Sequence, residues 1–404
     1  MTREEIYTQC VEKIAKTNCL LMELPTGSGK SKISIDLTNY LLSSKWYKDR
    51  HNINILLLVA KVVHKQTWKE EIEKWGGINH PTAKINIRME CYESMHKCEG
   101  NWDIVIGDEV HHIGSEARLE LLKTIHFGYF LGLSATIPQK LKQLFLFRYH
   151  AQVVSCGLTE AIKDDILPEP QILLFPLLLD NRNPTETWEY FPKAPGRIVY
   201  ADYKDIRKYK FNKKVHSIIS MTQKQKLIEY NNLIDWFKKQ TMQSNNPAMK
   251  QSWLYQAGKR LEFLANCKLG IVNDILLKLA KERTITFCKT IEQAETVGEY
   301  CIHSQNAKAN EIYHDFNAKK IDHITAVNIL NENANLVDCK YGIFCNFSSS
   351  DVCVPQRLGR LLRHKEPVII FPYYVGTREE ELVKDYIENF SKSSIKTIHS
   401  IQEI

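Results

Sequence analysis

The sequence lacks the features that would place a protein in a membrane or outside the cell. No hydrophobic run reaches the roughly 18–20 residues that a membrane-spanning helix requires. The first residues, Met1-Thr-Arg-Glu-Glu, contain no apolar core of a signal peptide. None of the eleven cysteines forms a C-x-x-C pair, and the closest group, Cys339, Cys345 and Cys353, lacks the spacing of zinc ligands. We therefore expect an intracellular, cytoplasmic protein with reduced thiols and no membrane partner.

The composition is that of a globular protein with one unusual segment. A chain of 404 residues is too long for one typical domain and fits two. The net charge is +7, but the segment from Arg197 to Arg260 holds fourteen Lys and Arg against four Asp and Glu, so the remainder of the chain is slightly acidic. Nine aromatic residues lie between Tyr200 and Tyr255. This basic block is either a solvated helical surface or a contact for a sugar-phosphate backbone with stackable bases.

The segment Leu24-Pro-Thr-Gly-Ser-Gly-Lys-Ser31 predicts a phosphate-binding loop. An apolar run, Cys19 to Met22, precedes it as a candidate strand, and residues 32–42 follow with apolar positions at helical spacing. Gly27 and Gly29 permit a backbone in which successive N–H groups surround a phosphate at a helix N-terminus. The general G-x-x-x-x-G-K-[ST] pattern has a glycine where this chain has Leu24.

This loop predicts ATP and Mg²⁺ as cofactors. Lys30 is expected to reach the β- and γ-phosphates, and the Ser31 hydroxyl to hold Mg²⁺. Gln9, on a predicted helix just upstream, has an amide that can bond an adenine edge. The residues expected to bind the nucleotide are Gln9, Thr26, Gly27, Ser28, Gly29, Lys30 and Ser31.

A second motif supplies carboxylates. Asp108 and Glu109 end a short apolar strand that begins at Asp103, and ligands bind at the carboxyl ends of parallel strands. Asp108 suits the Mg²⁺ shell, and Glu109 suits orienting and deprotonating an attacking water. The next predicted strand ends in Ser134-Ala-Thr136.

Strand and helix alternation resumes in the second half of the chain, beyond a linker that contains Pro168 and Pro170. Near the end, Arg357, Arg360 and Arg363 lie at i, i+3 and i+6 of a predicted helix, so their guanidinium groups share a face. We predict an α/β fold with two parallel-sheet domains and a mainly helical basic insertion. The expected boundaries are a first domain over 1–158, a linker and first strand over 159–181, the insertion over 182–265 and a second domain over 266–404.

These motifs, in this order, resemble those of superfamily 2 helicases of the DExH type, and most closely the compact phage and repair-type DNA helicases. The loop ending at Ser31 is similar to motif I, and the segment from Val59 to Trp75 to motif Ia. The other matching segments are Cys91 to Ser94 (motif Ib), Asp108 to His111 (motif II), Ser134 to Thr136 (motif III), Phe287 to Lys289 (motif IV), Leu330 to Leu336 (motif V) and Gln356 to Arg363 (motif VI).

The resemblance implies RecA-like folds in both domains and ATP-driven movement along nucleic acid. It implies that His111, Ser134 and Thr136 couple hydrolysis to nucleic-acid binding. It also implies catalytic roles for Lys30, Asp108, Glu109, Gln356, Arg360 and Arg363. The implied nucleic-acid contacts are Lys61, Tyr92, Ser94, Lys289 and Asn333. Motif V departs from the family pattern, because Asn333 stands where the family usually has glycine.

The leading hypothesis is an ATP-dependent DNA helicase or translocase of replication, recombination or repair, encoded by a cell or a virus, with sequence-independent backbone contacts. One alternative is a duplex translocase that serves a partner nuclease, because the chain shows no nuclease carboxylate cluster of its own. Another is an RNA-dependent ATPase that remodels RNA. A non-catalytic binding protein would leave Lys30, Glu109 and the arginines without a use. DNA is favoured over RNA because the block between the domains contains no recognisable RNA-binding module.

Overall fold

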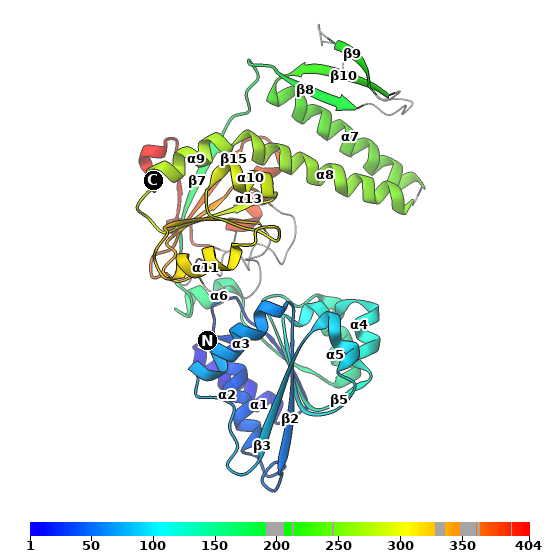
Figure 1. Cartoon of the computed structure of the whole chain (residues 1–404), viewed down its shortest axis with the longest axis vertical. Coiled ribbons are helices and arrows are strands. Elements are labelled where there is room, and N and C mark those ends of the chain that lie inside the picture. Colours follow the sequence, from blue (N-terminus) through cyan, green and yellow to red (C-terminus); the bar gives the residue numbers. More distant parts are fainter. Residues whose placement is uncertain are drawn as a thin grey trace.

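The computed structural model describes residues 1–190, 206–211, 214–244, 246–327, 336–347, 361, 364–388 and 390–404. Two α/β domains with parallel sheets stand one above the other, and an arm projects from the second of them (Figure 1). The predicted fold class is therefore confirmed. No helix in the described part of the chain is long and apolar enough to cross a membrane.

The sheet of the first domain is parallel and has the order β3-β2-β4-β5-β1-β6 among the described strands. These strands are β1 (Cys19–Glu23), β2 (Asn52–Val59), β3 (Lys84–Cys91), β4 (Gly100–Asp108), β5 (Ile125–Ser134) and β6 (Gln152–Ser155). Neighbouring side chains of a strand point to opposite faces. Leu20 and Met22 accordingly join one buried cluster, whereas Cys19 and Leu21 join another. A core on both faces explains the nearly continuous apolar sequences of the central strands.

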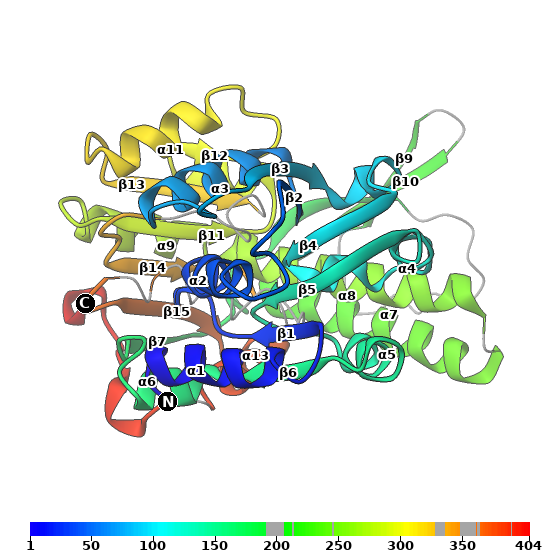
Figure 2. The same cartoon turned by 90° about the horizontal axis from the view of Figure 1, so that it is seen from below.

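Helices cover both faces of this sheet (Figure 2). One face carries α1 (Arg3–Ile14), α2 (Lys30–Leu42) and α3 (Val62–Lys74), and the other carries α4 (Glu116–Leu122) and α5 (Gln139–Tyr149). Local sequence sets their ends. A capping box between Thr2 and Glu5 starts α1. Gly76 and Gly77, with φ of 85° and 84°, follow α3 in the left-handed region, which ends the helix.

The chain crosses to the second domain through α6 (Leu158–Lys163). Leu158 and Ile162 of this helix pack against the cores of both domains. The strand predicted from Gln171 then forms as β7 (Gln171–Leu177), which lies inside the second sheet between β15 and β16.

The second sheet has the order β12-β13-β11-β14-β15-β7-β16 among the described strands, and every pairing in it is parallel. Its further strands are β11 (Thr284–Cys288), β12 (Cys301–Ile302), β13 (His323–Val327), β14 (Tyr341–Phe344), β15 (Val368–Tyr374) and β16 (Ile395–Thr397). Its helices are α9 (Leu269–Lys278), α10 (Ile291–Val297), α11 (Ala309–Asn317) and α13 (Arg378–Ile387). The sequence predicted a helix from Ile291 to Cys301, but α10 ends earlier because Gly298 packs against Thr325, where a Cβ would approach Thr325 Cγ2 to 2.6 Å.

The insertion differs in part from the prediction. It contains the expected helices, α7 (Gln223–Ser244) and α8 (Pro247–Cys267), which lie side by side as an arm (Figure 1). Asn246 caps α8 and Pro247 occupies its first turn. Before them, however, β8 (Thr185–Tyr190), β9 (Ile206–Phe211) and β10 (Lys214–Met221) form an antiparallel sheet. The alternation Tyr209-Lys210-Phe211 was the signal for a strand, and the high lysine content concealed it.

Glycine allows one close contact that positions the C-terminal motif. Leu361 is fully buried and lies against Gly342 of β14, where a Cβ would stand 2.1 Å from Leu361 Cδ1. Leu361 is the described residue between Arg360 and Arg363. The predicted residues Asn333, Gln356, Arg360 and Arg363 themselves lie outside the described residues.

We predict that Gly342→Ala lowers the free energy of unfolding by about 1–3 kcal/mol, because the added methyl group must displace Leu361. Gly270→Ala is the matched control, since no heavy atom lies within 4 Å of the position of its Cβ. This control should change stability by less than about 1 kcal/mol, in the stabilising direction. Chemical denaturation of both variants measures the difference, and equal stability would contradict the contact.

Candidate active site

The phosphate-binding loop predicted from the sequence joins β1 to α2. Gly27 and Gly29 have φ of 92° and 96°, in the left-handed region that side chains disfavour. Gly29 is the N-cap of α2, and no atom lies within 4 Å of the position of its Cβ, so the backbone angle and not crowding requires glycine there. The helix N-terminus that follows favours an anion.

The polar side chains of this loop suit a phosphate. The Lys30 ammonium donates to the Leu24 carbonyl at 3.0 Å, which holds it within the loop. Thr26 and Ser28 are buried, and their hydroxyl oxygens have no hydrogen-bond partner within the protein. Buried hydroxyls without partners are unfavourable. A bound triphosphate would supply oxygens to the loop, so these residues fit the nucleotide predicted from the sequence.

Two aromatic side chains position Asp108 at the end of β4. The Trp68 indole Nε1 donates to Asp108 Oδ2 at 2.9 Å, and the Tyr92 hydroxyl donates to the Asp108 carbonyl at 2.8 Å. The carboxyl group of Asp108 is buried, so a cation such as Mg²⁺ would compensate its charge. Among the described residues, no group of three or more His, Cys, Asp and Glu forms a metal site made by protein ligands alone.

Glu109, His111, Ser134 and Thr136 form one hydrogen-bonded cluster. Ser134 Oγ lies 3.1 Å from Glu109 Oε2, 3.0 Å from His111 Nδ1 and 2.8 Å from the Thr136 carbonyl. His111 Nδ1 is also 3.4 Å from Glu109 Oε2. Glu109 itself has φ of 52°, a left-handed conformation that a non-glycine residue adopts rarely. The structure therefore brings together four residues that the sequence placed in two separate motifs.

The cluster is also connected to the phosphate-binding loop. Glu23 of β1 pairs with Ser134 of β5, and the Leu24 N–H donates to the Ser134 carbonyl at 3.0 Å. Leu24 in turn accepts the hydrogen bond from Lys30. A continuous series of hydrogen bonds thus runs from Lys30 through Leu24 and Ser134 to Glu109.

One of the predicted nucleic-acid contacts, Tyr92, lies in the core of the first domain. Tyr92 is only 1% exposed and its hydroxyl faces Asp108, so it supports the acidic motif from within the core. Burial raises the pKa of its phenol, and Asp108 and Glu109 raise it further, so the hydroxyl remains a donor. The motif predicted the place of Tyr92 at the end of β3 but not the direction of its side chain.

Other predicted residues lie apart from the cluster. Gln9 donates to the Met1 sulfur at 2.9 Å, and its role toward adenine stays a prediction. Lys61 is exposed and Ser94 is partly exposed. Lys289 points toward the insertion, where its ammonium donates to the Gly258 carbonyl of α8, and burial lowers its pKa.

Sequence reasoning missed Trp68. In the sequence, Trp68 occupies an apolar position of an amphipathic helix, which predicts burial but no polar contact. A buried tryptophan, however, carries one N–H that needs a partner. Its place on the helix after β2, beside the strand that ends in Asp108, was the available signal.

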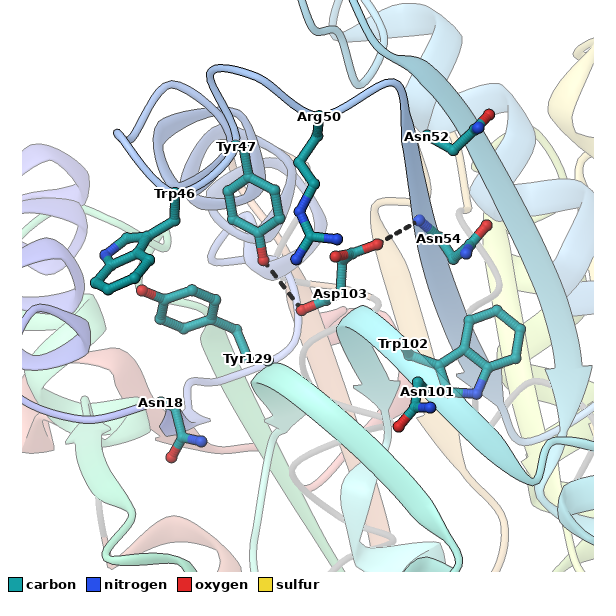
Figure 3. Close-up of a pocket in the computed structure, with 11 residues that line it drawn as sticks. Asn18, Trp46, Tyr47, Arg50, Asn52, Asn54, Asn101, Trp102, Asp103 and Tyr129 are labelled. Carbon is teal, nitrogen blue, oxygen red and sulfur yellow. Dashed lines mark hydrogen bonds between the residues drawn. The ribbon is translucent and has the colours of Figure 1, made fainter.

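A separate hollow of about 470 Å³ lies at the opposite edge of the first sheet (Figure 3). There Asp103 accepts hydrogen bonds from the Asn54 N–H at 2.8 Å and from the Tyr47 hydroxyl at 3.2 Å. The hollow lies where strands begin, whereas Lys30 and Asp108 lie where strands end. It is therefore not part of the candidate active site.

Comparison with known proteins agrees with this geometry. Residues 2–139 match the family described as type III restriction enzyme, res subunit, and residues 267–365 match the helicase conserved C-terminal domain. The chain belongs to the superfamily 2 helicases. The subtype within the superfamily, and the predicted closeness to phage and repair enzymes, remain predictions.

Individual relatives are distant in sequence. The DNA 3'-5' translocase XPB2 of Sulfurisphaera tokodaii is 19% identical over 366 residues, which cover 86% of this chain and 75% of the relative. S. cerevisiae Dbp5 bound to RNA and ADP BeF3 has a TM-score of 0.57 at 10% identity, covering 98% of this chain and 89% of that one. The ATP-dependent type ISP restriction-modification enzyme LlaBIII bound to DNA also has a TM-score of 0.57, at 12% identity, with 99% and 31% covered. These structures show that the helicase has the RecA-like fold.

We predict that Trp68→Phe destabilises the helicase by about 1–3 kcal/mol, because it removes the indole N–H that donates to the buried Asp108 carboxylate. Trp75→Phe is the matched control, since Trp75 belongs to the same segment and donates to Glu71 at an exposed position. The control should cost less than about 0.5 kcal/mol. Urea denaturation of the two variants measures both values, and equal costs would show that the bond to Asp108 is unimportant.

Proposed function

We propose that this helicase is an ATP-dependent motor that moves along DNA. The observation that carries the proposal is the cluster in which Glu109, Ser134 and His111 meet beside the phosphate-binding loop. A buried carboxylate at hydrogen-bond distance from two polar side chains suits general-base chemistry on water. The relatives include a DNA translocase and a DNA-bound restriction enzyme.

The described residues divide the work as follows. Lys30 and the N–H groups around Gly27 and Gly29 would hold the triphosphate, and Ser31 and Asp108 would hold Mg²⁺. When bound, the nucleotide supplies the phosphoryl group whose transfer to water releases free energy. Glu109 accepts the proton of that water. The Ser134 hydroxyl and His111 orient Glu109, so a change at either one alters the position of the base.

The second domain completes the site in this proposal. Arg360 and Arg363 would supply positive charge to the γ-phosphate, and Gln356 would lie nearby. Leu361 lies between Arg360 and Arg363 in the sequence. Its buried side chain packs against Gly342 and anchors this segment to β14. An arginine from a second domain is typically worth about 10³–10⁵ in rate, so hydrolysis would depend on how the two domains are placed.

The arm formed by α7 and α8 is the proposed nucleic-acid contact of the second domain. Lys238, Lys239 and Lys250 are exposed on it, together with Trp236 and Tyr255, which are 45% and 60% exposed. Cations and stackable rings on one element suit a sugar-phosphate backbone and its bases. The same helices also pack partly buried aromatics against each other, with the ring centroids of Tyr230 and Phe263 5.5 Å apart.

A second candidate function is a duplex translocase that serves a nuclease subunit. The similarity of residues 2–139 to the res subunit of type III restriction enzymes favours it. ATP hydrolysis measured without polynucleotide and with single-stranded DNA, duplex DNA, a fork or RNA distinguishes the candidates. Stimulation by duplex DNA without strand separation indicates the translocase, and stimulation by RNA alone would overturn the proposal of a DNA motor.

We predict that Glu109→Gln lowers the ATP hydrolysis rate by about 10²–10⁴, because the amide cannot accept the proton of water. Binding of Mg²⁺–ATP should stay within about threefold, since the phosphate-binding loop is unchanged. Steady-state hydrolysis and equilibrium binding of a fluorescent ATP analogue measure the two quantities. Lys30→Ala is the comparison, because it should weaken binding as well. Retained hydrolysis in Glu109→Gln would show that another group is the base.

We also predict that replacing Lys238, Lys239 and Lys250 together by Gln weakens DNA binding and lowers its salt dependence. Each lost phosphate contact should reduce the slope of log K against log salt by about 0.7–0.9. The control replaces Lys281, Lys392 and Lys396, which are exposed in the second domain, and removes the same charge. Fluorescence anisotropy at several salt concentrations gives the slopes. Equal slopes for the two triple variants would exclude the arm as a backbone contact.

A further inference from the structure

Helix α8 is bonded to the second domain along its C-terminal half. The Lys289 ammonium donates to the Gly258 carbonyl at 2.5 Å. The Gln293 amide donates to the Glu262 carbonyl at 3.3 Å and to Asn266 Oδ1 at 2.7 Å. Successive turns of α8 are therefore attached to the second domain by defined hydrogen bonds.

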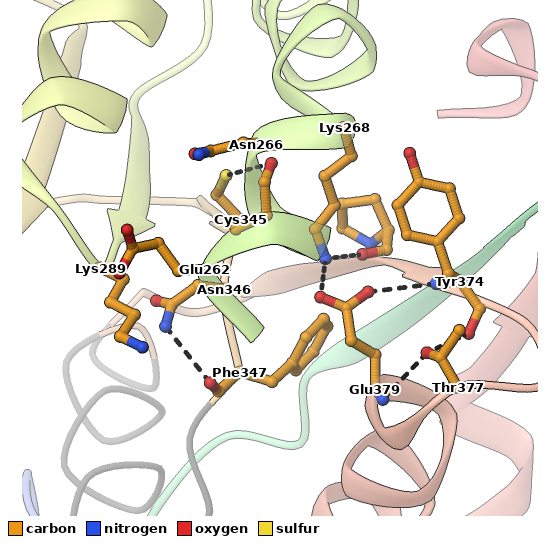
Figure 4. A network of polar contacts seen from close by, with 12 residues as sticks. Glu262, Asn266, Lys268, Lys289, Cys345, Asn346, Phe347, Tyr374, Thr377 and Glu379 are labelled. Carbon is orange, nitrogen blue, oxygen red and sulfur yellow. Dashed lines mark hydrogen bonds and ion pairs between the residues drawn. The ribbon is translucent and has the colours of Figure 1, made fainter. Parts of the chain in front are cut away.

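The last attachment is a buried ion pair (Figure 4). Lys268 and Glu379 are both fully buried, with Lys268 Nζ 2.6 Å from Glu379 Oε1. The same ammonium donates to the Pro372 carbonyl at 3.0 Å and lies 4.5 Å from the centre of the Phe347 ring. The other carboxylate oxygen accepts the Tyr374 N–H at 3.2 Å. Each charge is therefore compensated from several directions, and the position of Lys268 is fixed by three separate segments of the second domain.

Such a pair is not the simplest way to stabilise a core. Desolvation of two charges offsets much of their attraction, and apolar residues of similar size often serve stability as well or better. Burial raises the pKa of the Glu379 carboxyl, while Lys268 and the Tyr374 N–H act in the opposite direction. Beyond stability, the pair fixes the relative position of these three segments. The Lys268 ammonium can keep its two hydrogen bonds and its contact with the Phe347 ring in only one arrangement of them.

One end of this network reaches the arm. The Tyr374 side chain forms a buried cluster with Leu227 of α7 and Leu264 of α8. Within the arm, the Arg260 guanidinium donates to Asn231 Oδ1 at 2.7 Å and connects the two helices. Glu379 therefore holds the backbone of the residue on which both arm helices rest.

The other end reaches the edge of the second sheet where ligands bind. Lys289 directly follows β11, and Phe347 follows β14 by three residues, so both lie at carboxyl ends of parallel strands. Phe347 also precedes, in sequence, the segment that contains Arg360 and Arg363. A shift of α8 must therefore move Lys268 relative to Phe347 or carry Phe347 with it.

We propose that Lys268 and Glu379 are positioning residues that couple the α7–α8 arm to the nucleotide-binding edge of the second domain. Nucleic acid on the arm then controls the rate of ATP hydrolysis through α8, Lys268 and Phe347. This inference rests on the proposed function of a nucleic-acid-stimulated ATPase. The intact pair is therefore needed for stimulation of hydrolysis by nucleic acid, but not for binding of the nucleic acid.

The test uses the full chain with Lys268→Met and Glu379→Gln together, which removes both charges while keeping the side chains similar in size. The matched control carries Lys384→Met and Glu380→Gln. These residues form an ion pair of 2.8 Å on α13, the helix that also carries Glu379, and the Lys384 side chain is 69% exposed. Thermal denaturation, ATP hydrolysis with and without single-stranded DNA, and DNA affinity are measured for wild type and both variants.

The expected result is a loss of stimulation without a loss of binding. In the double variant of the buried pair, stimulation by DNA should fall about tenfold, with basal hydrolysis and DNA affinity within about twofold of wild type. The exposed-pair control should behave as wild type. A purely structural role would instead lower melting temperature, basal rate and stimulated rate together.

Two outcomes separate this inference from the proposed function. If wild type is stimulated and the folded double variant is stimulated equally, the inference is wrong while the proposed function stands. If wild type hydrolyses ATP without any stimulation by nucleic acid, both are overturned. If the double variant fails to fold, Glu379→Gln alone, which keeps the size of the side chain and leaves the bond from Lys268 to Pro372 in place, is judged by the same ratio of stimulated to basal rate, and unchanged stimulation overturns the inference.

Discussion

The candidate active site depends on one hydroxyl proton. Ser134 has a single proton to donate, yet its oxygen lies within hydrogen-bond distance of both Glu109 Oε2 and the Thr136 carbonyl. Donation to Glu109 lowers the basicity of the carboxylate and fixes its direction, whereas donation to Thr136 releases it. His111 adds a second polar atom, at 3.0 Å from Ser134 and 3.4 Å from Glu109. The Glu109 carboxylate therefore has two hydrogen-bonding arrangements that differ by a rotation of one hydroxyl group.

Ser134, whose hydroxyl can take these two orientations, is connected to the phosphate-binding loop through the backbone. The Leu24 N–H is bonded to the Ser134 carbonyl, and the Leu24 carbonyl accepts from Lys30. A phosphate that attracts Lys30 away from Leu24 would remove one of these bonds and leave the other in place. The parallel sheet makes this possible, because it fixes Glu23 opposite Ser134 and so sets the loop and the cluster at the same edge.

The sequence predicted those parts of the protein in which the chemistry is local. The glycines of the loop, the acidic pair and the apolar strands each depend on a short segment, and the structure places them as expected. Side-chain direction was harder to predict. Tyr92 and Lys289 follow strands at the expected edge, but Tyr92 turns into the core and Lys289 turns toward α8, because their partners, Asp108 and Gly258, are distant in sequence.

Long-range pairs could not be predicted for the same reason. Lys268 and Glu379 are separated by 111 residues, and nothing near either one distinguishes it from an exposed helical charge. Strand β9 of the insertion was hidden because its sequence mixes aromatics with lysine and arginine, a composition that also fits a solvated helix. In each case, the residue type was known, whereas its partner depended on the tertiary fold.

The two domains therefore use different kinds of constraint. The first places its candidate catalytic groups through adjacent strands, whose register sets which residues lie opposite one another. The second connects distant segments through a buried ion pair, whose charges tolerate few other arrangements. The proposed motor would use both properties. The groups proposed to act on water would keep their geometry within the first domain, while a movement of the arm would change the position of groups in the second. A buried charge pair suits the second task better than an apolar contact, because apolar surfaces can slide past one another, whereas the Lys268 ammonium is held by two acceptors and a facing aromatic ring.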